Sequence, residues 1–323
     1  FYTNSRCNKV LRGVSFDIRR GRTLCVVGES GCGKSVTANS ILRLLPELSR
    51  IESGSITYYK EDGSEVRLDQ LEKNGKEMRA LRGQDIAIIF QDPMTALNPV
   101  FTVGYQIEEM LREHKKGLTK AQYKEEAIED LADMGIPAPE IRYGEYPHQF
   151  SGGMRQRSMI AMGMSCEPKI LLADEPTTAL DVTISAQIFD LMNELKEKHG
   201  TAIMMITHNM GVVAEMADEV AVMYMGNIVE YGKAEDIFTN PTHPYTKALL
   251  RSIPILGKGK DQQLEPIRGS TPDPFNRPKG CQFCPRCDYA CERCETEMPP
   301  EQWVKEGHYS RCFNYKEVMA SGK

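Results

Sequence analysis

The chain has 323 residues, of which 41% are hydrophobic, and its formal net charge is −5 at pH 7. This length is enough for one sizeable hydrophobic core and a smaller appendage. The acidic balance argues against a nucleic-acid-binding surface as the main purpose of the chain. No stretch approaches the roughly 20 apolar residues that span a bilayer, and no signal peptide is visible. We therefore expect any membrane role to depend on a partner protein.

A phosphate-binding loop is the first strong signal in chain order. Residues 28–35 read GESGCGKS, a short apolar stretch precedes them at 23–27, and residues 35–45 can form a helix before a proline. This order of strand, loop and helix is the context that the G-x-x-x-x-G-K-S spacing requires. We expect the Lys34 ammonium to neutralise phosphate charge, the Ser35 hydroxyl to bind Mg²⁺, and backbone N–H groups to surround the β-phosphate. The predicted nucleotide contacts are Gly28, Glu29, Ser30, Gly31, Cys32, Gly33, Lys34 and Ser35.

The middle of the chain changes from strand patterns to helical ones. Residues 60–75 are charged and contain glycine, as in a hairpin with a loop, and the strand predicted at 86–90 is followed by Gln91. Apolar residues then recur at helical spacing from residue 98 to about 164, which predicts a helical subdomain. Within it, small residues open a helix whose N–H groups can form a second phosphate nest: Ser151, Gly152 and Gly153. Because the first loop already covers one phosphate face, we expect this nest to bind the nucleotide of a partner subunit.

Two further buried strands end in polar residues. The run KILLADEP at 169–176 ends with Asp174 and Glu175, and TAIMMIT at 201–207 is followed by His208. Parallel strands of this kind bring the side chains at their carboxyl ends to one edge of a sheet. We expect Asp174 to hold Mg²⁺ through water and Glu175 to act as the general base on the water that attacks the γ-phosphate.

The C-terminal segment contains six of the ten cysteines: Cys281, Cys284, Cys287, Cys291, Cys294 and Cys312. It is too short for a hydrophobic core of its own, which predicts an additional staple. Disulfides conflict with the reducing cytosol in which ATP is available, so metal binding is the stronger interpretation. The C-x2-C-x2-C-x3-C spacing from Cys281 to Cys291 is typical of bacterial ferredoxins and favours an iron–sulfur cluster, with zinc on four thiolates as the alternative.

These motifs together resemble those of ATP-binding cassette (ABC) ATPases from residue 1 to about 240. The phosphate loop, Gln91, the FSGGMRQ signature, LLADEP, the segment 179–181 and His208 follow the order of that family. The resemblance implies that Gln91 joins the Mg²⁺ shell and senses the transporter. It also implies that Asp181 couples two sites across a dimer and that His208 contacts the γ-phosphate.

Two features depart from the family pattern. The signature begins FSGGM rather than LSGGQ, which keeps the serine and both glycines. In addition, residues 5–9, where the family places an aromatic residue that stacks on adenine, contain none. Phe1 or Tyr2 is expected to take that role.

The segment after the cassette resembles a narrower group within the family. NPTHPYTKALL at 240–250 resembles the HPYT element of dipeptide, oligopeptide and nickel permease ATPases. The resemblance continues through 278–281, 285–287 and 298–300, and so covers essentially the whole chain. It implies a 4Fe-4S cluster on more widely spaced ligands than the ferredoxin spacing gives: Cys281, Cys287, Cys294 and Cys312.

The predicted fold is α/β, a P-loop NTPase of the ABC type followed by a small cysteine-rich, metal-binding domain. The cassette is expected at 1–240, with its helical subdomain at about 98–164. The extension is expected at 241–323, with the cluster segment at 281–312. The predicted function is ATP hydrolysis that powers the import of dipeptides or oligopeptides through a membrane permease.

ATP, Mg²⁺ and the iron–sulfur cluster are the expected cofactors, and nucleic acid is not an expected partner. The expected partners are a second cassette, identical or paralogous, integral membrane permease subunits and, indirectly, an external substrate-binding protein, which places the chain at the cytoplasmic face of the membrane. A soluble cassette ATPase acting on ribosomes or DNA is the alternative, although such proteins typically hold two cassettes and basic surfaces. The sequence leaves the solute open among peptide, nickel and haem.

Overall fold

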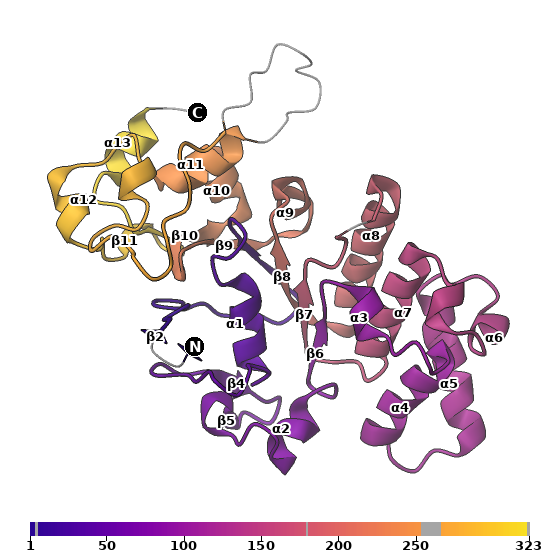
Figure 1. Ribbon diagram of the computed structural model, residues 1–323. Helices are drawn as coiled ribbons and strands as arrows, with labels where there is room; N and C mark the ends of the chain where they lie inside the picture. Colours follow the sequence, from indigo (N-terminus) through magenta and orange to yellow (C-terminus); the bar gives the residue numbers. More distant parts are fainter. Residues whose placement is uncertain (4–5, 179, 253–265, 322–323) are drawn as a thin grey trace.

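The computed structural model describes residues 1–3, 6–178, 180–252 and 266–321, so Ala179 and residues 253–265 lie outside the described residues. A central sheet has the strand order β11-β12-β10-β9-β3-β8-β7-β6, and the strands from β9 to β6 run parallel to their neighbours (Figure 1). Its strands are β3 (Thr23–Val27), β6 (Ile86–Ile89), β7 (Ile170–Asp174), β8 (Ala202–Thr207), β9 (Glu219–Tyr224), β10 (Asn227–Lys233), β11 (Gln302–Lys305) and β12 (His308–Ser310).

Both faces of the sheet are covered, because successive strand residues point to opposite sides. In β3, Leu24 and Val26 pack into one apolar cluster, whereas Cys25 and Val27 pack into the other. Two helices and a small hairpin contribute to the first cluster, and helices of the second half of the cassette contribute to the other (Figure 1). These elements are α1 (Lys34–Ile41), α2 (Lys76–Leu81), β4 (Thr57–Tyr59), β5 (Glu65–Arg67) and η1 (Leu68–Gln70) on the first side, and α8 (Val182–His199) and α9 (Met210–Met216) on the second.

A helical lobe projects from the second face, as the apolar spacing between 98 and 164 predicts (Figure 1). Its helices begin with capping residues: the Thr119 side chain accepts the N–H of Gln122, whose side chain accepts the N–H of Thr119 in return. Ile107, Leu111 and Leu131 are buried in its core. The lobe comprises α3 (Pro93–Ala96), α4 (Val103–His114), α5 (Lys120–Asp133), α6 (Pro139–Arg142), η2 (Pro147–Gln149) and α7 (Gly152–Met164).

Two elements are shorter than the sequence predicts. Helix α1 ends at Ile41 rather than at Leu45, and Arg43 just beyond it adopts a φ of 55°, a left-handed conformation that cannot continue a helix. Strand β6 ends at Ile89 rather than at residue 90. Among the described residues, no helix combines the length and the apolar character that a membrane crossing requires.

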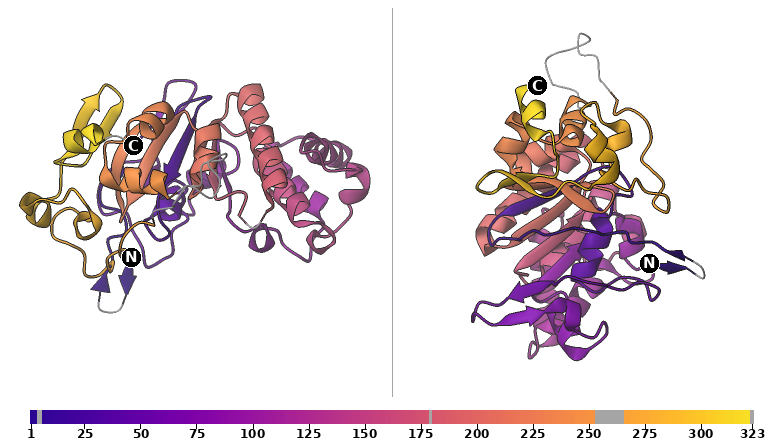
Figure 2. Two further views of the ribbon diagram at one scale, coloured as in Figure 1. Left: turned by 90° about the horizontal axis from the view of Figure 1, so that it is seen from above. Right: turned by 90° about the vertical axis from the view of Figure 1, so that its left-hand side faces the viewer.

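The C-terminal extension lies at the end of the sheet away from the helical lobe (Figure 2). It does not form a separate sheet, because β12 pairs antiparallel with β10 of the cassette and places Tyr309 opposite Tyr231. The extension thereby shares the cassette core, to which Phe283 and Tyr245 also contribute. Helix α10 (Ala234–Thr239) precedes the extension. The helices of the extension are α11 (Pro244–Arg251), η4 (Cys284–Arg286), α12 (Glu292–Thr296) and α13 (Tyr315–Ala320). At the N-terminus of the chain, the short strands β1 (Tyr2–Thr3) and β2 (Arg6–Cys7) pair with each other.

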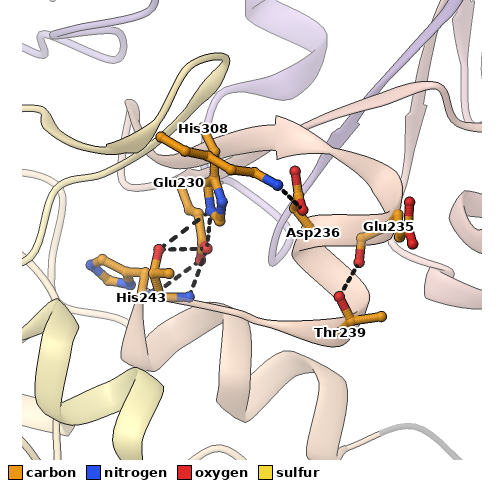
Figure 3. Close-up of polar contacts among 8 residues, drawn as sticks. Glu230, Glu235, Asp236, Thr239, His243 and His308 are labelled. Carbon is orange, nitrogen blue, oxygen red and sulfur yellow. Dashed lines mark hydrogen bonds and ion pairs between the residues drawn. The ribbon is translucent and has the colours of Figure 1, made fainter.

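A buried polar network joins the extension to the cassette (Figure 3). The Glu230 carboxylate, fully buried in β10, accepts the N–H and hydroxyl of Thr242 (both 2.7 Å) and the N–H of His243 (2.9 Å). It also lies 3.0 Å from Nε2 of His308 in β12. Burial raises the pKa of this carboxyl, but the hydrogen bonds from His308 and Thr242 outweigh that effect, so its pKa is lower than usual. The network therefore holds a charged carboxylate at the join.

Candidate nucleotide-binding site

The phosphate loop connects the end of β3 to the start of α1. Gly28, Gly31 and Gly33 have φ values of 149°, 79° and 111°, which favour glycine. A Cβ on Gly28 would lie 2.2 Å from the Met223 carbonyl oxygen, and one on Gly33 would lie 2.7 Å from Leu11, so the loop tolerates no larger residue at either position. Lys34 Nζ donates to the carbonyl oxygens of Gly28 (2.8 Å) and Glu29 (3.2 Å). The ammonium group of Lys34 is therefore held inside the loop in which it is expected to contact phosphate.

Three of the predicted site residues meet beside the loop. Strands β6, β7 and β8 are adjacent and parallel, so Gln91, Glu175 and His208 follow their carboxyl ends. Gln91 Nε2 donates to Glu175 Oε2 (3.0 Å), and Nδ1 of His208 lies 3.1 Å from Glu175 Oε1. Glu175 has a φ of 47°, an unfavourable left-handed conformation for a residue with a side chain. The predicted convergence of Glu175 and His208 at one sheet edge is confirmed, Gln91 joins them there, and backbone strain occurs at Glu175.

Asp174 has the properties of a magnesium-binding carboxylate. Its side chain is buried, and its Oδ1 atom has no hydrogen-bond partner within the described part of the chain. Burial raises its pKa, the Glu175 charge raises it further, and the Ser35 hydroxyl and the Lys34 ammonium lower it. An unpaired carboxylate oxygen beside a serine hydroxyl matches the oxygen ligands that Mg²⁺ prefers. Ser35 and Asp174 thus fit the ion, with Gln91 at the same edge.

The predicted second phosphate nest lies in the helical lobe. Ser151 caps α7 by accepting the N–H of Met154 (3.3 Å), and Gly152 and Gly153 form the first turn of that helix. Helix α7 belongs to the lobe on the opposite side of the sheet from α1 and the phosphate loop (Figure 1). Asp181 caps α8, where its side chain accepts the N–H of Ile184 (2.9 Å). The predicted roles of these residues across a dimer stay predictions.

The candidate adenine-stacking residues lie in the N-terminal hairpin. The Tyr2 N–H donates to the Leu48 carbonyl (2.7 Å), and the Tyr2 hydroxyl bonds with Glu52 and accepts from Arg50 Nε (2.9 Å). Phe1 is half-buried beside it. These contacts attach the hairpin to the segment after α1, and the stacking role of either residue stays a prediction.

Sequence patterns gave no sign of a second set of residues that contacts the phosphate loop. Tyr245, Thr271 and Arg286 of the extension all form hydrogen bonds with Glu29. A cavity of about 450 Å³ between the loop and the extension is lined in part by Ser30, His208 and Arg286. Arg286 lies 257 positions from Glu29 in the chain, and no spacing rule connects such distant residues.

The predicted metal site in the extension is not confirmed. Within the described residues, which include all the cysteines of this segment, there is no group of three or more His, Cys, Asp or Glu side chains placed to hold a metal ion. The cysteines are free thiols, and Cys291 Sγ lies 3.4 Å from Cys294 Sγ. Burial raises the pKa of Cys281 to about 11 and that of Cys287 and Cys312 to about 12. The segment is instead attached to the cassette by strand pairing and by the Glu230 network.

The phosphate loop on a parallel sheet, with a flanking helical lobe, places the chain in the class of P-loop ATPases. Comparison with known proteins narrows that class. Residues 11–178 match the ABC transporter family, and residues 229–294 match the family described as the oligopeptide/dipeptide transporter C-terminal region. The chain belongs to the ABC transporter family, as an ATP-binding subunit.

Relatives align over nearly the whole chain. The chain is 48% identical over 326 residues to a putative peptide import ATP-binding protein of Brucella abortus, covering 99% of this chain and 96% of the relative. It is 48% identical over 314 residues to the dipeptide transport ATP-binding protein DppD of Bacillus subtilis, covering 97% and 91%. Among solved structures, the dimeric ATP-binding cassette MJ0796 with ADP and phosphate has a TM-score of 0.63 at 26% identity and covers 72% of this chain and 94% of that one.

Proposed function

We propose that the chain is the ATP-hydrolysing subunit of an importer that moves dipeptides or oligopeptides through a membrane permease. The observation that carries this proposal is the match of residues 229–294, most of which lie beyond the cassette, to the C-terminal region of oligopeptide and dipeptide transporters. The relatives from Brucella abortus and Bacillus subtilis, named for peptide import and dipeptide transport, support the same cargo class.

The geometry of the phosphate-loop edge supports an assignment of roles in hydrolysis. The loop from Gly28 to Ser35 binds the ATP phosphates, and Lys34 neutralises part of their charge. Ser35, Gln91 and Asp174 would hold Mg²⁺, which would supply positive charge beside the phosphates. Glu175 orients and deprotonates the attacking water, because its two oxygens already contact Gln91 and His208 at the strand ends. His208 contacts the γ-phosphate.

Two cassettes, identical or paralogous, close around the nucleotides. Ser151, Gly152 and Gly153 at the start of α7 meet the nucleotide of the partner, and Asp181 at the start of α8 connects the two sites. The helix N-terminus that these residues form favours an anion. Similarity to the MJ0796 cassette, which is dimeric in its solved structure, supports this arrangement. ATP binding then closes the dimer and hydrolysis reopens it.

The helical lobe carries the side chains suited to a permease. Phe90 precedes Gln91 and is exposed, and the lobe adds Val100, Phe101, Tyr105 and Tyr146, which are also exposed. Phe101 and Tyr105 stack on each other with ring centroids 5.0 Å apart. Exposed aromatic side chains of this kind are enriched at protein interfaces. Docking of a permease on this surface would place it next to Gln91 and hence next to Glu175.

Reconstitution tests the cargo. Vesicles that contain this chain with its permease and binding-protein partners should accumulate a labelled dipeptide or short oligopeptide only when ATP is supplied on the cassette side. A Glu175→Gln version of the same complex is the matched control and should bind the peptide without accumulating it. Accumulation of nickel or haem with no peptide uptake would refute peptide as the cargo. Purification with ribosomes or DNA in place of a membrane protein would instead support the soluble cassette class.

We propose also that Cys281, Cys287, Cys294 and Cys312 hold a 4Fe-4S cluster. The Cys281 N–H donates to the Cys294 carbonyl oxygen (2.8 Å), which supports the proximity of two of these four residues. Serine at Cys294 or Cys312 should remove iron, sulfide and visible absorbance from anaerobically purified protein. Serine at Cys284 or Cys291 should leave all three. The opposite pattern would favour the ferredoxin spacing, and stoichiometric zinc without sulfide would refute both cluster assignments.

A further inference from the structure

Glu29, the second residue of the phosphate loop, is held by the C-terminal extension. Arg286 donates to both oxygens of its carboxylate, from Nη1 to Oε2 (2.6 Å) and from Nη2 to Oε1 (3.0 Å). Thr271 adds a hydrogen bond to Oε2 (3.2 Å). The Glu29 N–H donates to the hydroxyl of Tyr245 (2.8 Å). Every one of these partners comes from the extension.

The same residue also contacts the phosphate-binding lysine. The Glu29 carbonyl oxygen accepts from Lys34 Nζ (3.2 Å) and from the Cys32 N–H (3.3 Å). The backbone of Glu29 therefore lies between Tyr245 on one side and the lysine on the other. A displacement of Glu29 would move one of the carbonyl groups that orient the lysine.

Arg286 is itself held in one position. Its side chain is 4% exposed, its Nε donates to the Arg268 carbonyl oxygen (2.8 Å), and its guanidinium carbon lies 5.8 Å from the ring centroid of Phe283. A bidentate guanidinium–carboxylate pair has a geometry that a lysine ammonium cannot reproduce. The Glu29 side chain is 29% exposed, so its charge lies partly in solvent, within the phosphate loop itself.

We propose that Arg286 and Tyr245 are positioning residues for ATP binding, through which the extension sets the shape and the charge of the phosphate loop. The inference rests on the proposed role of the chain as an ATPase but not on its cargo. Arg286 neutralises a carboxylate that would otherwise repel the triphosphate, and Tyr245 holds the backbone of the same residue. The extension is then part of the nucleotide site.

Kinetics of the purified full-length chain test the charge component. Arg286→Met should raise the KM for ATP about tenfold, with a smaller change in kcat, because the unpaired Glu29 carboxylate opposes ATP binding. The double variant Glu29→Gln, Arg286→Met removes that carboxylate and should bring the KM back to within about threefold of the wild-type value. A purely structural role for Arg286 predicts no such recovery. A double variant with the same KM as Arg286→Met would overturn the proposal.

Milder substitutions test the same proposal with less risk of unfolding the protein. Tyr245→Phe removes one hydroxyl and should raise the KM about threefold. Arg286→Gln keeps a hydrogen-bond donor for the Arg268 carbonyl and should reproduce the KM increase of Arg286→Met. The matched control is Arg268→Met, because the side chain of Arg268 is 81% exposed and pairs with Asp288 at the surface, while the backbone carbonyl that holds Arg286 is kept. The KM of this control should equal that of the wild type. Equilibrium binding of ATP, read without peptide or permease, separates failure of this inference from failure of the proposed cargo. An unchanged KM in both Arg286 variants would refute it.

Discussion

The phosphate-loop edge and the Glu230 network are both clusters of charged side chains on the same sheet, but they differ in how far their polar groups are satisfied. At the loop edge, Asp174 retains a buried oxygen without a partner in the described part of the chain, and Glu175 is strained. In the network, Glu230 accepts from Thr242, His243 and His308 while fully buried. Buried polar groups are normally paired, so unpaired groups and strain indicate a site that receives a ligand.

This difference predicts opposite consequences of mutation. Residues at the loop edge should affect turnover with little effect on folding, because a strained or unpaired side chain contributes little to the stability of the folded state. Residues of the Glu230 network should affect folding with little effect on the chemistry, because removal of one partner leaves the others buried and unpaired. Each of the following experiments tests one side of that comparison.

The largest effect is expected at Glu175. Glu175→Gln keeps the shape of the side chain, so ATP binding should persist while turnover falls by roughly 10²- to 10⁴-fold through loss of the general base. Single-turnover ATP hydrolysis and equilibrium ATP binding measure the two quantities separately. The thermal unfolding midpoint should stay close to that of the wild type. Near-normal hydrolysis would show that another group activates the water.

The second effect concerns the nest at the start of α7, and the structure selects the residue to change. A Cβ on Gly153 would lie 2.9 Å from Ile184 of the same chain, whereas among the described residues the nearest neighbour of one on Gly152 is Leu180, at 3.6 Å. Gly152→Asp therefore preserves the fold and adds a negative charge where the nucleotide of the partner is expected. In a Glu175→Gln background it should abolish the ATP-stabilised dimer in light scattering, and alone it should lower turnover by about 10²-fold. A persistent ATP-dependent dimer would refute the assignment of this nest to a partner's nucleotide.

Sequence reasoning succeeded where chemistry depends on local spacing. The phosphate loop and the meeting of Gln91, Glu175 and His208 follow from short motifs at the ends of parallel strands, so both were predictable. The extension was predicted to need a staple because it lacks a core of its own. It instead continues the cassette sheet, through β12, and pairs His308 with Glu230, 78 positions away. Strands as short as β11 and β12 give almost no periodic signal, and pairing over such a distance cannot be read from spacing.

The third prediction tests the network as a structural join. Glu230→Ala leaves the partners of the carboxylate buried without an acceptor, and should lower the free energy of unfolding by about 3 kcal/mol. Chemical denaturation measures this value. The matched control is Glu297→Ala, which removes an exposed pair with Arg293 and should cost at most about 0.5 kcal/mol. ATP turnover per folded molecule should survive in Glu230→Ala, and a loss as large as that of Glu175→Gln would mean that the network also takes part in catalysis.

The fourth prediction is a dependence of stability on pH that arises at His243. Burial lowers the pKa of His243 to about 4, although the Glu230 charge and a backbone hydrogen bond at Arg311 oppose the shift. The unfolded chain therefore binds a proton near the ordinary pKa of 6.5 that the folded chain does not, so stability should fall as the pH drops from 6.5 towards 4, by at most about 1.4 kcal/mol per pH unit. His243→Asn retains a side-chain acceptor for the Tyr245 N–H, which His243 Nδ1 accepts at 3.1 Å, but cannot titrate. Denaturation midpoints between pH 7.5 and 4.5 should thus give a flatter profile for the variant, with a constant offset. The pKa of Glu230 is also lowered in the folded protein, so the stability that its charge contributes is lost only at more acidic pH. The two groups can therefore be distinguished by the pH range in which stability falls. Equal slopes for variant and wild type would show that His243 is protonated in the folded protein, and that the join between extension and cassette carries a charged pair rather than a neutral imidazole.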